Sequence, residues 1–217
     1  MRFNVAIDGP SAAGKSSIAK LVAKHYNLIH LDTGAMYRCV AYYALENGID
    51  LDDEEALKSM LSTIKIQLTN TDVFINNVKV TDQIRENKIS MGASVVSKHL
   101  LVRKELVKRQ QEMAKNLGFI MDGRDIGTVV LKNAKIKIFL TATSSARAER
   151  RYKENLRKGI VSDYNQLVKE IEQRDYNDCN RVNSPLRQAE DAVLVDTSNL
   201  SIEEVVSKIC KIIDEKR

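Results

Sequence analysis

The residues with the clearest chemical meaning lie close to the N-terminus. Two glycines five positions apart are followed by a lysine and two hydroxyl residues, and the stretch consists of Gly9, Pro10, Ser11, Ala12, Ala13, Gly14, Lys15, Ser16 and Ser17. This spacing is typical of a loop whose backbone N–H groups surround phosphate oxygens. In such a loop Lys15 reaches the β- and γ-phosphates, and the Ser16 hydroxyl holds Mg²⁺. The pattern predicts binding of a nucleoside triphosphate such as ATP.

The residues around the loop favour the same interpretation. Residues 3–8 are typical of a short buried strand, and Ile18, Leu21 and Val22 follow at helical spacing. A phosphate loop needs a strand before it and a helix start behind it, because the helix N-terminus adds positive potential. The alternative is an ordinary turn rich in Gly, Ser and Ala. The complete motif in this context favours nucleotide binding.

Arginine is the second chemical signal. Its planar guanidinium group suits bidentate contact with phosphate and neutralises charge on a phosphoryl group in transfer. Several arginines fall in or beside expected loops and helix ends, namely Arg38, Arg103, Arg124, Arg147, Arg150, Arg151, Arg174 and Arg181. So many candidate phosphate contacts suggest two phosphorylated substrates, although some of these side chains are expected to be ordinary solvated surface residues.

The elements that must position these residues alternate along the chain. Apolar runs near residues 3, 28, 119, 135 and 192 predict strands, and helical patterns lie between them. This alternation predicts a three-layer α/β fold with a five-stranded parallel sheet. Ligands of such sheets bind beyond the carboxyl ends of the strands. The carboxylates expected at strand ends are Asp8, Asp32, Asp122 and Asp196.

One segment has a strand-like pattern amid helical segments. Within residues 63–82, three short segments at 64–69, 73–75 and 78–80 are separated by polar turns. Short strands joined by Asn, Asp and Thr turns predict a small antiparallel sheet. Because it lies amid helical segments, we interpret it as an inserted subdomain.

Several boundaries can be assigned from capping residues and turns. Ser144 and Ser145 are expected to cap one helix, and Asp163 to begin the next. Ser201, with a glutamate three positions later, resembles a capping box in front of the C-terminal helix. Residues 123–128 are expected to form a loop after a buried strand.

Composition limits the class of protein. The chain has 217 residues and a net charge of +5, which suits anionic ligands. Three cysteines far apart predict neither a disulfide framework nor a zinc site. We interpret His25 and His30 as helix-end and strand-end residues rather than metal ligands, since neither has a partner at metal-binding spacing. No long apolar run or signal region is evident, so we expect a cytoplasmic protein without a membrane segment.

Four segments together point to a known family. They are residues 8–17, 31–38, 122–130 and 174–181, and the second to last contains Asp-Gly-Arg-Asp-Ile-Gly-Thr, which is far more selective than the phosphate loop. This combination resembles the bacterial cytidylate kinases of the P-loop nucleoside monophosphate kinase superfamily, and the resemblance spans nearly the whole chain. It implies transfer of the γ-phosphoryl group of ATP to CMP or dCMP, with Mg²⁺ as cofactor.

The resemblance also implies which residues bind the acceptor phosphate. Thr33 takes the place of a hydroxyl near the monophosphate, and Arg38, Arg124 and Arg181 match arginines that hold it. The acceptor phosphate is already mostly dianionic near pH 7, since its second pKa is about 6. A general base is therefore unnecessary. Catalysis is expected to consist of positioning and charge neutralisation.

A further group of residues matches the family's contacts to base and sugar. Ser94, Arg103 and Asp125 match cytosine readers, while Arg174 and Asp178 match contacts to the sugar. Cytosine presents an amino donor and a ring acceptor, which a carboxylate with Ser or Arg can pair. Uracil would place a carbonyl oxygen against the carboxylate, so it should be rejected.

We expect one kinase domain with three parts. The helix with Arg147, Arg150 and Arg151 is the candidate lid, whose closure would add arginines and exclude water. The expected catalytic residues are Lys15, Arg124, Arg147 and Arg151. The parts are a core (about 1–35, 117–143 and 180–217), a monophosphate-binding subdomain (about 36–116) and the lid (about 144–165).

Other functions stay open at this point. The nearest is a kinase of another acceptor, such as UMP, AMP or a small metabolite, on the same fold. A nucleotide-dependent nucleic-acid-binding protein is opposed by scattered basic residues and by only four Phe, seven Tyr and no Trp for base stacking. A regulatory switch without turnover is the third. We expect small-molecule substrates, no nucleic-acid partner and a monomer, because closing subdomains need freedom to move.

Overall fold

The computed structural model describes residues 3–69, 71–116 and 118–217. Residues 1, 2, 70 and 117, which fall within the expected core and insert, lie outside the described residues. The elements in chain order are β1 (Val5–Asp8), α1 (Lys15–Tyr26), β2 (Ile29–Asp32), α2 (Thr33–Glu46), α3 (Glu54–Thr63), β3 (Ile66–Leu68), β4 (Val73–Ile75), β5 (Val78–Lys79), the short turn η1 (Gln83–Arg85), α4 (Asn87–Val96), α5 (Leu100–Ala114), β6 (Phe119–Gly123), the short turn η2 (Ile126–Val130), β7 (Ile136–Thr141), α6 (Ser144–Arg157), α7 (Tyr164–Asn180), β8 (Val193–Asp196) and α8 (Ile202–Lys216).

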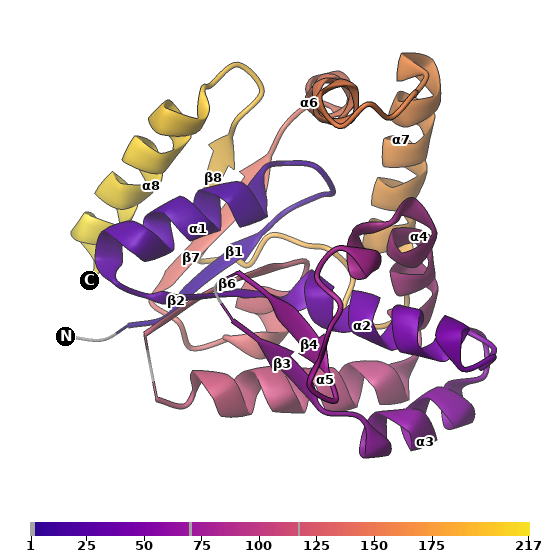
Figure 1. The fold of residues 1–217 in the computed structure, drawn as a ribbon. Coiled ribbons are helices and arrows are strands. Elements are labelled where there is room, and N and C mark those ends of the chain that lie inside the picture. Colours follow the sequence, from indigo (N-terminus) through magenta and orange to yellow (C-terminus); the bar gives the residue numbers. More distant parts are fainter. Residues whose placement is uncertain (1–2, 70, 117) are drawn as a thin grey trace.

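The described strands confirm the predicted fold class. A parallel sheet of five strands has the order β2-β6-β1-β7-β8 and lies between two layers of helices (Figure 1). Successive residues of β1 face opposite layers, because side chains alternate along a strand. Ile7 packs with apolar residues of α1 and α8, and Ala6 packs with those of α2 and α5. No helix of the described ranges is both long and apolar enough to cross a membrane.

The predicted insert is confirmed as a small antiparallel sheet of order β3-β4-β5. Ile66 pairs with Ile75, and both are buried. Asn76 and Asn77 turn the chain from β4 to β5 with φ of 48° and 67°, a left-handed conformation that Asn tolerates better than most residues. Ile75 also packs into the main apolar cluster on the α2 side of the large sheet, so the insert is attached to the core.

The helix ends agree with the sequence at two positions and differ at one. Asp163 caps α7, and Ser201 forms the predicted capping box of α8. The cap of α6, however, is Thr143, whose Oγ1 accepts a hydrogen bond from the N–H of Ala146 at 3.2 Å. Ser144 and Ser145 are the first residues of that helix, so their predicted capping role is wrong.

The segment predicted as a loop at residues 123–128 lies mostly within regular secondary structure. Gly123 ends β6, and η2 begins at Ile126. The two carboxylate oxygens of Asp8 accept the N–H groups of Ile126 and Gly127, both at 2.7 Å. Burial raises the pKa of Asp8 to about 6, although these two bonds act in the opposite direction. Asp8 therefore fixes the start of the turn from a distant strand.

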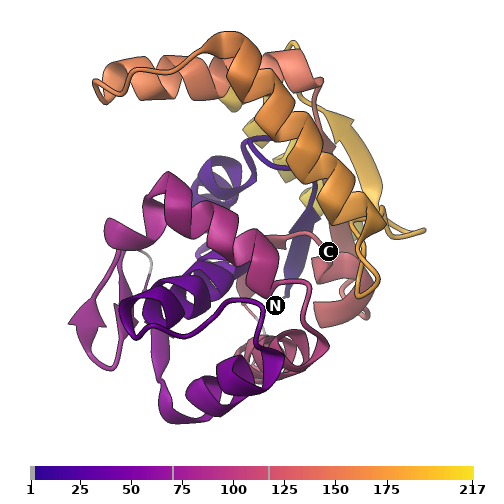
Figure 2. The ribbon, with the colours of Figure 1, turned by 90° about the vertical axis from the view of Figure 1, so that its right-hand side faces the viewer.

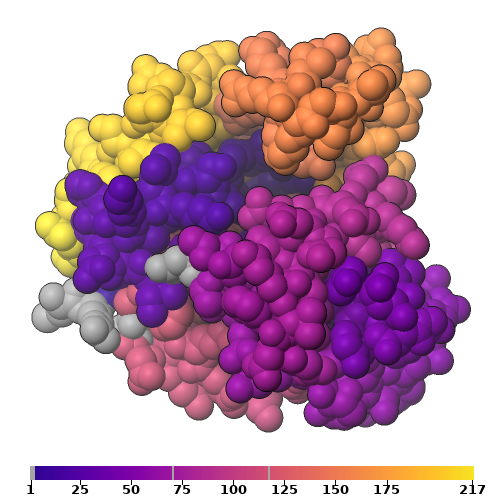
Figure 3. Space-filling view, viewed as in Figure 1, coloured from indigo at the N-terminus to yellow at the C-terminus, as the bar shows by residue number. Residues whose placement is uncertain are grey.

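Helices α6 and α7 form an antiparallel pair at one end of the molecule, as Figure 2 shows. They pack on each other around a separate small apolar cluster of Ala148, Leu167 and Ile171. In the space-filling view the surface is hollowed where this pair, the N-terminal segment and the α4 region meet (Figure 3). The predicted lid at about 144–165 covers α6, which shares this small cluster with α7. The division into three moving parts stays a prediction.

Candidate active site

The predicted phosphate loop joins the end of β1 to the start of α1. Gly9 has φ of 148°, and a Cβ atom there would lie 2.0 Å from the carbonyl oxygen of Leu140, so a side chain does not fit. Gly14 is the N-cap of α1 and offers no side-chain hydrogen bond. The N–H groups of the first turn therefore have no side-chain cap and are available to an anion.

Lys15 is buried behind this loop, and its Nζ donates to the carbonyl oxygen of Pro10 at 2.7 Å. Burial, and next the nearby Arg124, lower the pKa of Lys15 from 10.5 to about 7, although carboxylates including Asp122 favour the charged form. Among the described residues, no carboxylate makes a hydrogen bond to this ammonium group. A bound phosphate would supply an anionic partner.

Three side chains from three elements meet behind the loop. The Ser16 hydroxyl donates to Oδ2 of Asp122 at 2.7 Å, and Nε2 of His30 lies 2.6 Å from Oδ1 of the same carboxylate. Hydroxyl and carboxylate oxygens are the ligands that Mg²⁺ prefers, with phosphate oxygens and waters completing its shell. No cluster of three or more His, Cys, Asp or Glu able to hold a metal occurs among the described residues. The oxygens present fit Mg²⁺ shared with a nucleotide.

The sequence placed Asp122 at a strand end but assigned it no role. Its neighbours follow from the sheet order, because β6 lies between β1, which leads to Ser16, and β2, which carries His30. His30 lies near the end of β2, as expected, and its carboxylate partner is 92 residues away, beyond any local spacing in the sequence. A strand-end carboxylate next to a phosphate loop is the signal that could have identified Asp122.

The residues predicted to hold the acceptor phosphate make contacts within the protein. The Thr33 hydroxyl donates to the carbonyl oxygen of Asp122 at 2.8 Å. Nη2 of Arg38 lies 2.7 Å from Oδ2 of Asp32. Nε of Arg124 donates to Asp178 at 2.6 Å. Each cation is thus held by a carboxylate through one of its nitrogens.

Four guanidinium groups from separate elements also influence one another. The pKa of Arg174 falls to about 10, first because of burial and next because of Arg124, with smaller effects of Arg151 and Arg38. Buried nitrogens without a hydrogen-bond partner among the described residues include Nε of Arg38, Nε of Arg174 and Nη2 of Arg181. Unpaired buried donors are uncommon in folded proteins, and here they favour an anionic ligand.

The residues predicted to read the base form a compact buried cluster. Nη2 of Arg103 donates to Oδ2 of Asp125 at 2.5 Å, and Nη2 of Arg181 lies 4.0 Å from Oδ1 of the same carboxylate. The guanidinium of Arg103 also lies over the ring of Tyr37, 5.5 Å from its centroid. Ser94 stands apart, since its hydroxyl donates weakly, at 3.4 Å, to its own helix.

The three arginines of α6 differ in direction. Arg147 is buried, and its guanidinium donates to the carbonyl oxygens of Ser11 and Ala142 and to the carboxylate of Asp175. Arg150 turns away to Thr197 after β8. Arg151 is 40% exposed and lies 3.8 Å from Glu154. Of the two predicted catalytic arginines in α6, Arg147 therefore contacts the phosphate loop directly, and Arg151 does not.

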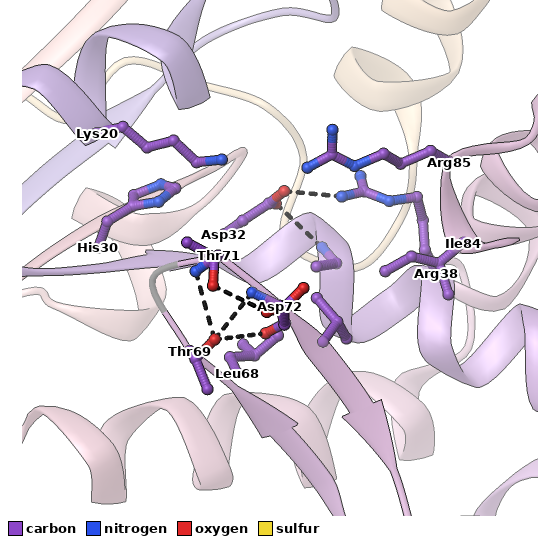
Figure 4. Close-up of a pocket in the computed structure, with 12 residues that line it drawn as sticks. Lys20, His30, Asp32, Arg38, Leu68, Thr69, Thr71, Asp72, Ile84 and Arg85 are labelled. Atoms are coloured by element: carbon purple, nitrogen blue, oxygen red, sulfur yellow. Dashed lines mark hydrogen bonds and ion pairs between the residues drawn. The ribbon is translucent and has the colours of Figure 1, made fainter. Parts of the chain in front are cut away.

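A cavity of about 40 Å³ lies between α1, β2, α2 and the insert. Figure 4 shows its lining, in which the side chains of Lys20, His30, Arg38 and Arg85 stand around Asp32. Neither Lys20 nor Arg85 belongs to a motif, so the sequence does not identify them. The cavity extends the cationic lining of the site beyond the predicted phosphate contacts.

Comparison with known proteins adds independent information. The family model described as Cytidylate kinase matches residues 5–215. A curated protein named Cytidylate kinase from Bacillus subtilis (strain 168) is 49% identical over 219 residues, which cover 99% of this chain and 98% of that protein. One of the same name from Ligilactobacillus salivarius (strain UCC118) is 52% identical, with 99% and 98% covered.

Among solved structures, an uncharacterized protein from Eubacterium ventriosum ATCC 27560 aligns with a TM-score of 0.55. It covers 99% of both chains at 12% sequence identity. At that identity the likeness shows a shared fold and nothing about the reaction.

Proposed function

The chain belongs to the cytidylate kinase family, and on that premise we propose that it transfers the γ-phosphoryl group of ATP to CMP and dCMP. The family match over residues 5–215 carries this proposal. The buried pair of Arg103 and Asp125 supports it, because its charges and hydrogen-bonding groups suit the edge of cytosine. The chain thus carries both a phosphate loop for ATP and a candidate site for the acceptor base.

The donor side would be bound by residues 9–17. The N–H groups at the start of α1 would face the β- and γ-phosphates of ATP, and Lys15 would regain its full charge beside them. We propose that Mg²⁺ is held by Ser16, whose hydroxyl is oriented by its hydrogen bond to Asp122. When bound, the cation neutralises charge on the β- and γ-phosphates.

The acceptor side would be bound by the arginines of the cleft. In Arg124, Nε is engaged by Asp178, and no other hydrogen bond to this guanidinium occurs among the described residues. Its two terminal nitrogens are thus available to a phosphate in bidentate fashion. Arg38 and Arg181 would add charge from α2 and from the end of α7, with Thr33 as a hydroxyl donor. Arg174 and Asp178 would contact the sugar.

Cytosine would be read by the buried cluster. Its amino group would donate to Asp125, and its ring nitrogen would accept from Arg103, with Ser94 on α4 as a further proposed contact. An oxygen of the acceptor phosphate would then attack the γ-phosphorus in line, and ADP would leave. The acceptor oxygen carries negative charge already, so no proton needs removal. Arg124, Arg147 and Arg151 would neutralise the transferring group.

The decisive experiment measures ADP formation from Mg·ATP with CMP, dCMP, UMP, AMP or no acceptor. We expect strong turnover with CMP and dCMP and little with UMP. A different preferred acceptor would keep the fold and the phosphate loop but overturn the base-reading assignment. ADP formation that does not depend on any acceptor would overturn the kinase proposal itself.

We further propose that the protein acts as a monomer in the cytoplasm. Every proposed site residue comes from the same chain, so the site is complete without a partner. The three cysteines are free thiols, which suits a reducing compartment. Sedimentation equilibrium at assay concentrations should therefore give the mass of a single chain.

A further inference from the structure

His30 takes no part in the proposed phosphoryl transfer. It lies in β2, and only 7% of it is exposed. Strand β2 pairs with β6 so that His30 stands opposite Ile120, and Asp32 stands opposite Asp122. The imidazole reaches diagonally along this ladder, and Figure 4 shows it at the edge of the cavity near Lys20. Its Nε2 comes within 2.6 Å of Oδ1 of Asp122.

The direction of this bond follows from the chemistry of the carboxylate. An ionised Asp122 can only accept, so Nε2 of His30 must carry the hydrogen. The other oxygen, Oδ2, accepts from Ser16 at 2.7 Å. The main-chain oxygen of Asp122 accepts from Thr33. The carboxylate is therefore held from two sides, by β2 through one oxygen and by α1 through the other.

Both oxygens of the carboxylate matter because Ser16 is the proposed ligand of Mg²⁺. If Oδ1 were released, the carboxylate could rotate about its Cβ–Cγ bond and move Oδ2 away from Ser16. Outer hydrogen bonds of this kind fix the orientation of groups that bind a metal. An apolar side chain at position 30 would fill the same space but hold nothing.

We propose that His30 is a positioning residue for the nucleotide-bound Mg²⁺: its hydrogen bond to Oδ1 of Asp122 keeps Oδ2 aligned with the Ser16 hydroxyl. This inference rests on the proposed function, since it presumes that ATP binds with the metal at Ser16. His30 touches neither nucleotide nor metal and acts through Asp122.

Four variants separate this role from a packing role. His30→Leu keeps apolar bulk but removes the donor. His30→Gln places an amide N–H donor at a similar reach, whereas His30→Asn is too short to contact Asp122. His25→Leu is the matched control, because His25 is an exposed histidine at the end of α1. Thermal unfolding of each variant establishes that it is folded.

The readout is the ratio of ATP affinity with saturating Mg²⁺ to ATP affinity with a chelator, measured by calorimetry. Loss of an outer hydrogen bond at a metal site typically costs 10–100-fold. We expect His30→Leu to lower the ratio about 10-fold, with metal-free ATP affinity and CMP affinity within about twofold of the wild type. His30→Gln should restore most of the ratio, and His25→Leu should leave it unchanged.

Two results would overturn the proposal. One is an unchanged ratio in His30→Leu. The other is an equal loss of metal-free ATP affinity, CMP affinity and metal-dependent affinity, which would indicate a packing role. If His30→Leu does not fold, the comparison of Gln with Asn decides, and equal ratios in these two variants would contradict the proposal. A wild type that binds Mg·ATP but phosphorylates no acceptor would instead refute the proposed function, and the affinity ratios would still test His30.

Discussion

At the scale of single residues, Asp125 carries more of the proposed specificity than any other side chain. It is 5% exposed, and its charge is tolerated because Arg103 lies against one oxygen and Arg181 lies 4.0 Å from the other. A buried charge is expensive unless it is paired and hydrogen-bonded. The pair of Arg103 and Asp125 is thus already arranged before a nucleotide binds, which favours recognition of one base edge over another.

We expect Asp125→Asn to fold but to discriminate less well between CMP and UMP. Asn keeps the shape, but its amide cannot replace both the charge and the acceptor of the carboxylate. Hydrogen bonds to charged groups contribute about 1.5–3 kcal/mol, so kcat/KM for CMP should fall at least about 10-fold. The value for UMP should fall less. Steady-state kinetics with both acceptors measures the ratio, with the exposed Asp50→Asn as control. An unchanged ratio of CMP to UMP would contradict the assignment.

Lys15 gives a prediction about protons. Its pKa of about 7 leaves it mostly deprotonated at pH 8, whereas phosphate oxygens beside it would raise the pKa well above 8. ATP binding at pH 8 should therefore take up about one proton, and at pH 6, where Lys15 is already charged, uptake through this group should vanish. Calorimetry at pH 8 in two buffers of different ionisation enthalpy measures the uptake. Equal uptake by Lys15→Met would show that another group takes the proton.

The same pKa fixes the sign of a stability change. A lysine whose folded pKa is lowered binds its proton more readily in the unfolded chain between pH 7 and 10.5. The contribution of Lys15 to the free energy of unfolding should therefore rise as pH increases above 7 in the nucleotide-free protein. Chemical denaturation at pH 7 and pH 9 tests this, with Lys15→Met as the reference that lacks the group. A parallel pH profile in both proteins would contradict it.

The sequence predicted which residues lie at the site better than it predicted which residues they contact. The strand-end positions of Asp8, Asp32 and Asp122 follow from apolar runs, and each is where it was expected. Their contacts do not follow, because they depend on the order of strands in the sheet. His30 illustrates this: nothing near it in sequence shows that β6, some ninety residues later, lies beside it.

At the scale of elements, α6 shows how one helix can contain arginines with different tasks. Arg147 and Arg151 are one turn apart, but Arg147 is buried, Arg151 is 40% exposed and Arg150 points to Thr197. Arg147 joins α6 to the phosphate loop and to α7 through Ser11 and Asp175. The one ion-pair contact of Arg151 among the described residues is with Glu154 at 3.8 Å. Arg147 therefore ties the predicted lid to the phosphate loop, whereas Arg151 would give up little on turning toward a phosphoryl group.

We therefore expect the two arginine variants to behave differently. Arg147→Ala leaves Asp175 without its partner and should lower the free energy of unfolding by about 3 kcal/mol. Arg151→Ala should leave stability unchanged and lower kcat about 100-fold, as is typical when one donor to a developing charge is lost. Arg157→Ala, at the exposed end of α6, is the control. A normal kcat in Arg151→Ala would remove it from the catalytic residues.

Two elements show why the sequence could not settle every boundary. At the start of α6, Thr143, Ser144 and Ser145 are three consecutive hydroxyl residues, and any of them could cap a helix. Only the path of the chain leaving β7 selects Thr143. The turn η2 is similar, because it depends on Asp8, which lies more than one hundred residues earlier. The local sequence limits which residues can cap a helix or form a turn, and contacts with residues distant in the sequence decide which of them does.

At the scale of the whole molecule, arginines from several elements act on one another's charge. Arg124 after β6, Arg151 on α6 and Arg38 on α2 each lower the pKa of Arg174 on α7, while Asp178 acts in the opposite direction. Their repulsion opposes closure of the cleft in the absence of anions. Phosphates from two nucleotides would remove it. The alternation of strands and helices predicted the layers of the molecule. The repulsion between these arginines could not be predicted, because it depends on distances between side chains of different elements.

Closure should therefore require both nucleotides. Labels at Val78→Cys on the insert and Arg157→Cys on the lid, in a chain whose Cys179 and Cys210 are replaced by Ser, report the distance across the cleft by Förster resonance energy transfer. We expect a non-hydrolysable ATP analogue with CMP to shorten this distance, and either nucleotide alone to shorten it less, because each neutralises only part of the arginine cluster. Labels at Lys132→Cys and Lys211→Cys, both in the expected core, should not respond. An unchanged lid-to-insert distance with both nucleotides would show that α6 and α7 are a fixed wall of the site and that the division into core, subdomain and lid is wrong.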